Sequence, residues 1–364
     1  MITYITMTIL AVIFSALSNY DKNKKNSTVK MVFWYISEAI LIIVAAIRFD
    51  VGQDYMYTYV PYFKGVLKGN PNEDIEKGFL ILNKIVQLFT TDYAGIFIVC
   101  SVIFFHYIYK AIREQSEMPT LSIFLLVGTT YYFIFLNAMR QMIVVAVFLY
   151  SIKFIKERNL KKFLIYMLIC STIHLSALIC IPFYFFYGIK LRPLKAGIIL
   201  GIAIVLKPII SKLFLIIVKL TKYNYYIDSR FDTKETGYIV LAMNICVLIF
   251  AFIYYSKRKY DEIHIDKKIT EKNLKDYSYY CFLQLISTVL AWYNNAIPLL
   301  NRVRWATGIS IIILIPMIIK QEKNAKTRIL YTFLIVVLYS AYSLYTIGMK
   351  NSNNVLPYLT IFQR

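Results

Sequence analysis

The chain has 364 residues, of which 59% are hydrophobic and only 17% are charged, and its formal net charge is +21. Soluble domains are about half apolar and about one quarter charged, so this composition excludes an ordinary soluble protein. It also argues against a nucleic-acid-binding protein. The basic residues of such a protein would cover a soluble surface, whereas here they lie mostly between apolar runs.

Apolar runs long enough to cross a bilayer recur along the whole chain. The first covers residues 2–19, has no basic residues before it, and is predicted to be a transmembrane helix rather than a cleaved signal peptide. Further spans are predicted at residues 31–47, 93–110, 120–137, 138–155, 196–219, 237–256, 277–298, 303–319 and 327–348. We therefore expect a polytopic, all-α integral membrane protein of about 10–12 transmembrane helices, with residues 1–364 forming a single multi-helix domain.

Two apolar segments do not fit a simple span. Residues 79–90 are too short to cross a bilayer and contain Lys84, which is typical of an interfacial or re-entrant helix. Residues 163–187 form one long helix or two short ones hinged near His174. The distribution of basic residues favours two crossings, because most Lys and Arg then lie in cytoplasmic loops, whereas a single crossing leaves no charge bias.

The double crossing defines a topology. The N-terminus lies outside, the basic loops around residues 21–30, 153–162 and 257–275 lie in the cytoplasm, and loops 48–78 and 220–236 lie on the outer face. Because anionic lipid attracts cytoplasmic cations, most of the positive charge serves to orient the chain. The remaining outer-face arginines are the candidates for function, and the expected location is the cytoplasmic (inner) membrane of a bacterium.

The densest cluster of charged residues is RFDVGQDY, residues 48–55. Gly52 permits a tight turn that could direct Arg48, Asp50 and Asp54 into one pocket. The alternative is an arginine that reaches the membrane interface beside a solvated turn, which explains Arg48 but not the two aspartates that flank the glycine.

Arg140 lies between two apolar spans that are joined by almost no loop. An arginine at the membrane edge is energetically costly, so a functional role is favoured over that of a helix-end anchor. Arg302 and Arg304 begin another helix on the outer side; two residues apart, they point to different faces, so at most one is expected in a given site, with Trp305 at the interface.

Two further outer-face features carry weaker signals. His174 lies at the predicted hinge and is either a hydrogen-bonded structural residue or a functional one. The loop around Arg230 mixes tyrosines with Asp and Arg, as sugar-binding sites do, but tyrosine is common throughout the chain and an interfacial tyrosine belt explains it equally.

No cofactor or metal is expected. The five cysteines lie inside apolar stretches, the three histidines are far apart, and the chain contains neither HExxH nor a phosphate-binding glycine motif. Arginines at the outer face instead suggest an anionic substrate, because the guanidinium fork binds phosphate oxygens and stays charged. A lipid pyrophosphate fits, with its head at the interface and its tail between helices. One electrostatic donor contributes about 3–4 kcal/mol in a dry site.

At these residues the sequence resembles the EpsG/Wzy family of bacterial polysaccharide polymerases. The matches are RFDVGQDY, the Glu-x-Gly-Phe sequence that starts at Glu76, Arg140 with the following glutamine, Ile-His-Leu-Ser-Ala around His174, and Arg302 followed by a proline in the same helix. Thr58, Ile173 and Ala306 depart from the aromatic residues usual in the family, which concerns the shape of the sugar site rather than the class of protein.

The resemblance implies a multi-helix membrane glycosyltransferase similar to the GT-C class. Such an enzyme would transfer a growing glycan from undecaprenyl pyrophosphate to the non-reducing end of a lipid-linked repeat unit, without a metal ion, in the synthesis of O-antigen, capsule or exopolysaccharide. Its partners would be undecaprenyl-pyrophosphate-linked oligosaccharide and polysaccharide and membrane lipid, with no nucleic acid; the resemblance also allows a chain-length regulator protein.

The implied site has three parts. Arg48, Arg140 and Arg302 would bind the pyrophosphate. The catalytic base or acceptor-positioning group would be Asp54, Asp50 or His174, with Asp54 favoured because it matches the family sequence. Sugar or lipid contacts would come from Tyr55, Arg230, Arg304 and Trp305.

Two other functions remain open from the residues alone. A flippase or transporter for lipid-linked oligosaccharide would also need outward cations, but it predicts inverted repeats, which the sequence does not display by inspection. A glycan ligase would use a similar outer site of arginine and histidine, so the sequence separates it poorly from a polymerase.

Overall fold

The structure, a computed structural model, describes residues 1–20, 25, 27–219, 237–261, 267–294 and 300–364. The regular structure within these ranges is helical, apart from one antiparallel bridge between Arg48 and Thr360. The helices are α1 (Ile2–Ser18), α2 (Thr28–Ala46), η1 (Tyr55–Tyr59), α3 (Val60–Leu67), α4 (Lys77–Gln87), α5 (Ala94–Gln115), α6 (Pro119–Gly128), α7 (Tyr131–Asn137), α8 (Met139–Lys156), α9 (Leu160–Ser171), η2 (Leu175–Phe186), α10 (Pro193–Lys219), α11 (Tyr238–Asp261), α12 (Lys267–Tyr293), α13 (Leu300–Gly308), α14 (Ile311–Lys320), α15 (Ala325–Ser343), η4 (Leu344–Met349) and η5 (Ile361–Gln363).

The prediction of an all-α polytopic membrane protein is confirmed. Five helical stretches in the described part of the chain are long and apolar enough to cross a membrane, and the pair α6 and α7, bent by 52°, makes a sixth candidate. Three shorter apolar helices add to these. The number of helices that qualify as membrane spans by length and composition is thus below the predicted number. One reason is that the buried helix α8 carries three charged residues, Arg140, Lys153 and Lys156, and therefore does not qualify.

The described residues form two compact units. The first contains Met1–Ile181 and Glu322–Arg364, and the second contains Pro182–Gln321. The prediction of a single multi-helix domain stays a prediction beside this division.

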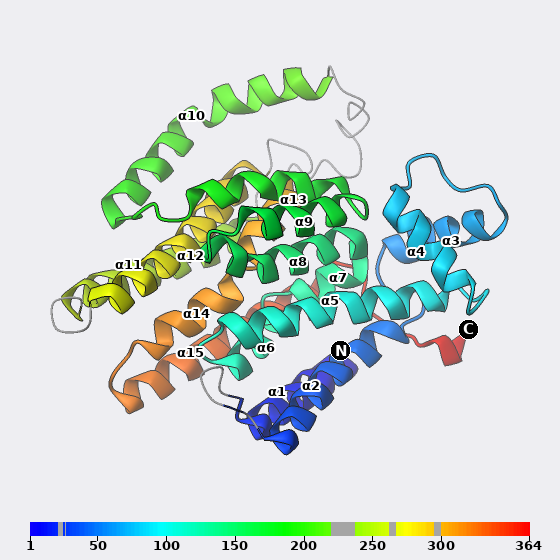
Figure 1. Cartoon of the computed structure of the whole chain (residues 1–364), viewed down its shortest axis with the longest axis horizontal. Helices are drawn as coiled ribbons and strands as arrows, with labels where there is room; N and C mark the ends of the chain where they lie inside the picture. Colours follow the sequence, from blue (N-terminus) through cyan, green and yellow to red (C-terminus); the bar gives the residue numbers. More distant parts are fainter. Residues whose placement is uncertain (21–24, 26, 220–236, 262–266, 295–299) are drawn as a thin grey trace. The chain divides into compact units, whose positions relative to one another are not determined.

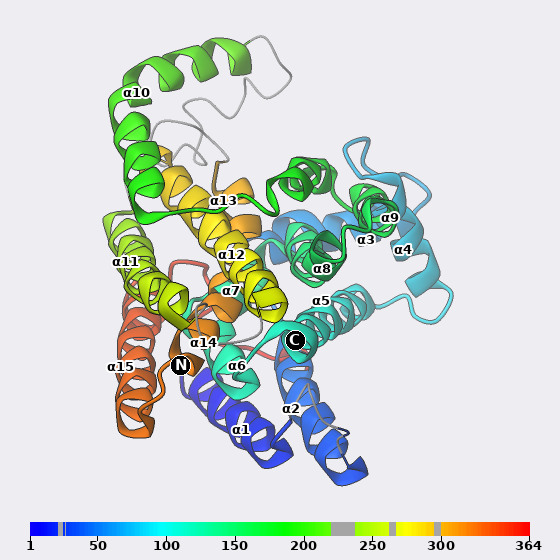
Figure 2. The ribbon, with the colours of Figure 1, turned by 60° about the vertical axis from the view of Figure 1, so that its left-hand side comes forward.

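In the first unit, α8 lies at the centre. It packs against α5, α7 and α9, while α2 packs against α1 and α5 (Figures 1 and 2). Almost every side chain of α8 from Met142 to Ile152 is buried, as expected for a helix that is apolar on all faces. Stacked aromatic rings support this core, for example Phe104 on Phe135, with centroids 4.2 Å apart. The start of α8 is therefore held on a rigid support.

In the second unit, α12 is the central helix and packs against α10, α11, α13 and α14. Two polar contacts tie α11 to α12. The Tyr277 hydroxyl donates to the Ala251 carbonyl at 2.6 Å, and the buried Gln284 amide donates to Asn244 at 2.8 Å. Each of these contacts pairs a buried polar side chain of α12 with α11.

The predicted hinge near His174 is confirmed. Helix α9 ends at Ser171, and the 3-10 segment η2 begins at Leu175. Because a 3-10 helix rises about 2.0 Å per residue instead of about 1.5 Å, the twelve residues of η2 extend over about 24 Å. The second half of the 163–187 segment, η2, is therefore longer than an α-helix with the same number of residues. The number of times that this segment crosses the membrane stays a prediction.

The last residues of the chain lie against the segment that follows α2. The amide of Phe49 donates to the Leu359 carbonyl at 2.9 Å, and the Gly52 amide donates to the Asn354 carbonyl at 2.9 Å. The Ile361 amide donates to the carbonyl of residue 47 at 2.8 Å. We name residues 354–364 the C-terminal strap. It pairs with residues 47–52 by backbone hydrogen bonds and so fixes the loop that precedes the candidate site.

Candidate functional site

A close backbone contact brings α4 to the end of α9. Gly78, in the first turn of α4, donates its amide to the Thr172 carbonyl at 2.8 Å, and Phe79 donates to the same oxygen at 3.3 Å. A Cβ atom at Gly78 would lie 2.2 Å from the Thr172 hydroxyl oxygen, so only glycine fits here. Glu76 immediately precedes α4, and its side chain is thereby held near the His174 turn.

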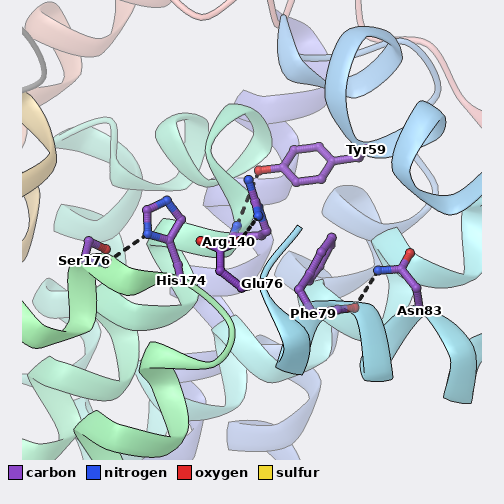
Figure 3. A network of polar contacts seen from close by, with 7 residues as sticks. All are labelled: Tyr59, Glu76, Phe79, Asn83, Arg140, His174 and Ser176. Atoms are coloured by element: carbon purple, nitrogen blue, oxygen red, sulfur yellow. Dashed lines mark hydrogen bonds and ion pairs between the residues drawn. The ribbon is translucent and has the colours of Figure 1, made fainter. Parts of the chain in front are cut away.

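Arg140 and Glu76 form an ion pair at the centre of this region (Figure 3). Nη1 of Arg140 donates to Oε2 of Glu76, and the two side chains keep 13% and 17% exposure. The rings of Tyr62 and Phe79 lie 5.1 and 5.3 Å from the guanidinium carbon. A cation over aromatic rings gains electrostatic stabilisation, so Arg140 is fixed in orientation yet still reachable from solvent.

Asp54 and Tyr59 lie beside this pair. The backbone amide of Asp54 donates to the Asn137 side-chain oxygen at 2.9 Å, which ties the aspartate to the turn before α8. The Tyr59 hydroxyl lies 3.4 Å from the Arg140 amide and accepts its hydrogen. Burial raises the pKa of Tyr59, Asp54 raises it further, and Arg140 lowers it, so Tyr59 remains a phenol that can donate a hydrogen bond.

His174 faces the same region from the hinge (Figure 3). Its Nδ1 accepts the backbone amide hydrogen of Ser176 at 3.1 Å. A neutral imidazole whose Nδ1 is an acceptor carries its proton on Nε2. In this tautomer Nε2 is a donor, suited to a phosphate or sugar oxygen.

Arg48 does not reach this site. Its side chain is fully buried, and its guanidinium donates to the Ala45 carbonyl, to the Leu136 carbonyl at 3.4 Å and to the Met139 sulfur at 2.9 Å. The ring centroid of Phe97 lies 4.9 Å from the guanidinium carbon. Aromatic rings and backbone carbonyls thus enclose Arg48 in this structure, and the predicted pyrophosphate contact stays a prediction.

Tyr55 is enclosed in the same way. It is fully buried, stacks on Phe97 with centroids 3.9 Å apart, and donates its hydroxyl to the Arg48 carbonyl at 3.2 Å. Its predicted contact with sugar or lipid stays a prediction. Asp50, by contrast, is exposed, with a φ of 51°. It lies on the segment paired with the C-terminal strap, and it is the exposed residue of RFDVGQDY, between the buried residues Arg48 and Val51.

The remaining predicted residues lie elsewhere. Arg302, Arg304 and Trp305 belong to α13 of the second unit, where all three are half-buried. Arg304 is held by Asn301, to whose side-chain oxygen it donates from Nε at 3.0 Å and from Nη2 at 2.9 Å. Arg230 lies outside the described residues. The roles predicted for these four residues stay predictions.

The described residues contain no group of three or more His, Cys, Asp or Glu side chains that could hold a metal ion. Of the five cysteines, Cys246 is exposed and the other four are buried. Burial agrees with the prediction that most of them act as small apolar side chains.

The sequence did not reveal that Glu76 and Tyr59 lie against Arg140. In the sequence, Glu76 stands out only as the first residue of Glu-x-Gly-Phe. The signal that could have found it is the combination of a carboxylate, a glycine that permits close backbone approach, and an unexplained arginine in a neighbouring span.

The sequence matches a known protein family. The family model described as the EpsG family matches residues 31–360, which is nearly the whole chain and includes both units. No curated protein and no solved structure gives a match. The resemblance deduced from the short sequence matches is thus confirmed over almost the full length. The chain belongs to the EpsG family.

Proposed function

We propose that this protein is a polysaccharide polymerase that transfers a glycan from undecaprenyl pyrophosphate to the non-reducing end of a lipid-linked repeat unit. Membership of the EpsG family points to a polymerase-like, glycosyltransferase-like role. The observation that carries the finer proposal is Arg140, a half-buried arginine fixed between two aromatic rings and a carboxylate. Such a cation is suited to neutralise a leaving pyrophosphate.

Three groups of the first unit have separate tasks in this reaction. Arg140 binds the pyrophosphate. His174, protonated on Nε2, donates a hydrogen bond to a phosphate or sugar oxygen. Asp54, anchored through Asn137, positions the acceptor glycan. Because arginines supply the positive charge, the proposal needs no metal ion.

The surroundings of the reaction follow from the same proposal. The site faces the outer side of the bacterial inner membrane, where lipid-linked repeat units arrive, in a GT-C-like arrangement of helices. A chain-length regulator protein is a candidate partner. The half-buried Arg140 and Glu76 support an interfacial site, since a charged lipid head and its apolar tail meet at that depth.

The experiment that tests this function is gene deletion followed by gel analysis of the glycan. A polymerase mutant should accumulate single repeat units on lipid and lose the polymer ladder, and a plasmid copy should restore the ladder. Asp54→Asn should fail to restore it while the protein remains in the membrane. A normal ladder in the deletion strain would refute the proposal.

Two alternatives give different results in the same gel. A flippase mutant would retain lipid-linked units on the cytoplasmic face. A ligase mutant would accumulate lipid-linked polymer. Accessibility of the accumulated glycan to an added glycosidase in intact and opened spheroplasts separates these outcomes.

A further inference from the structure

The carboxylate of Glu76 is the charged group of the site that the proposed function leaves without a chemical task. Its side chain faces Arg140 (Figure 3). Glu76 immediately precedes α4, on the segment that Gly78 holds against Thr172. An ion pair with Arg140 alone would explain its position but not why it remains partly exposed. Its side chain keeps 17% exposure.

The two oxygens of Glu76 have different surroundings. Oε2 accepts from Nη1 of Arg140, whereas Oε1 makes no hydrogen bond to any residue that the structure describes. A carboxylate has about four lone-pair positions, so it can hold the arginine and accept a further hydrogen at once. The second oxygen is thus placed for a hydroxyl that approaches from solvent.

Asp54 already has the task of positioning the acceptor glycan in the proposed function, and the two other base candidates are less well suited. His174 presents a donor at Nε2, because its Nδ1 already accepts the Ser176 amide. Asp50 is exposed on the segment that pairs with the C-terminal strap. Glu76 is the carboxylate bound directly to Arg140, and it therefore lies next to the position at which the pyrophosphate would leave.

We propose that Glu76 is the catalytic base of the glycosyl transfer, an inference that rests on the proposed function. The acceptor hydroxyl oxygen forms a bond to the anomeric carbon of the donor glycan, and the bond between that carbon and the pyrophosphate oxygen breaks. The electron pair leaves with the pyrophosphate, whose charge Arg140 neutralises. The hydroxyl proton passes to Oε1 of Glu76 and from there to water.

The test uses the purified full chain in lipid nanodiscs, with lipid-linked repeat units isolated from the deletion strain as substrate. Glu76→Gln keeps the shape of the side chain but removes its basicity, so kcat should fall about 10²–10⁴-fold with little change in KM for the donor. Glu76→Ala should be equally slow, and added formate should restore part of its turnover by supplying a carboxylate. The matched control is Glu73→Gln, three residues earlier in an exposed position, which should leave kcat unchanged.

Binding of inorganic pyrophosphate, measured by its protection against heat denaturation, gives a second readout. Removing the negative charge beside Arg140 should leave pyrophosphate affinity unchanged or tighten it in Glu76→Gln. Unchanged kcat in that variant would overturn the proposal, as would a raised KM with weakened pyrophosphate binding, which would make Glu76 a positioning residue.

Failure of this inference is distinct from failure of the proposed function. If the wild-type chain polymerises the units and Glu76→Gln does so equally well, the polymerase stands and the base is another group. If the wild-type chain extends no unit, and the deletion strain keeps its polymer, the proposed function itself is wrong.

Discussion

Arg48 and Arg140 are two arginines of the same unit with opposite surroundings. Arg48 is fully buried and directs its guanidinium to backbone carbonyls, a sulfur and aromatic rings. Arg140 keeps 13% exposure and pairs with a carboxylate that is itself partly exposed. Both attract attention as costly charges at helix ends. The difference teaches that the partner and the exposure of an arginine, rather than its place beside a span, show whether a ligand from solvent could reach it.

The largest effect is expected at Arg48. Arg48→Ala would leave a cavity among Phe97, Tyr55 and Phe135 and should lower the free energy of unfolding by about 3–5 kcal/mol. Arg48→Met restores most of the volume without the charge and should yield folded protein with near-normal polymerisation. Heat denaturation in detergent and the glycan ladder measure both variants. Folded but inactive Arg48→Met protein would give Arg48 a role in the reaction and remove the contrast.

Arg140 should behave in the opposite way. Arg140→Lys keeps a positive charge but loses the planar fork that binds phosphate oxygens. We expect a fall in polymerisation of about 10²–10³-fold, with the heat stability of the protein little changed. Quantification of polymer from membranes of equal protein content measures the loss. Full activity in this variant would show that the cation at residue 140 does not need a fork.

Gly78 tests whether the site depends on the contact between α4 and Thr172. A methyl group at residue 78 would meet the Thr172 hydroxyl and its carbonyl, so Gly78→Ala should lower stability by about 1–3 kcal/mol and reduce activity through displaced Glu76. Gly201→Ala in α10 is the matched control, because no atom lies within 4 Å of a Cβ placed there. Equal stability of the two variants would mean that the contact does not hold Glu76 in place.

The smallest effect concerns the ion pair of Arg364 with Asp92, at 2.6 Å. The hydrogen bond from Arg364 lowers the pKa of Asp92 below its ordinary value. The pair therefore stabilises the fold at pH values above the ordinary aspartate pKa, and this contribution is lost as the pH falls through the lowered one. Because both side chains are solvent-accessible, Asp92→Asn should cost less than about 1 kcal/mol at neutral pH. The difference in Tm between wild type and variant should shrink in acid and in high salt.

The sequence predicted those parts of the fold that depend on local composition. The apolar run at residues 31–47 corresponds to α2, that at 93–110 corresponds to α5, and the hinge near His174 lies where expected. The bend between α6 and α7 was not predicted. It depends on Thr130, whose φ of 68° is unusual for a β-branched residue and has no sequence signature.

The site was predicted in part. Arg140, His174 and Asp54 lie in one unit around a common region, as the sequence suggested. Glu76 was missed because its pairing with Arg140 joins residues 64 positions apart and depends on tertiary packing. The burial of Arg48 could not be predicted, because a sequence does not reveal whether a membrane-edge arginine turns toward carbonyls or toward solvent.

The C-terminal strap has a consequence for how the protein is made. Residues 354–361 supply the hydrogen-bond partners of residues 47–52, but they are synthesised about 300 residues later. At a synthesis rate of about 5–20 residues per second, the N-terminal helices have by then been in the membrane for at least several seconds. The loop before Asp54 therefore cannot reach its final shape on a nascent chain. Folding of this loop thus waits for a segment that is synthesised after every helix from α2 to α15.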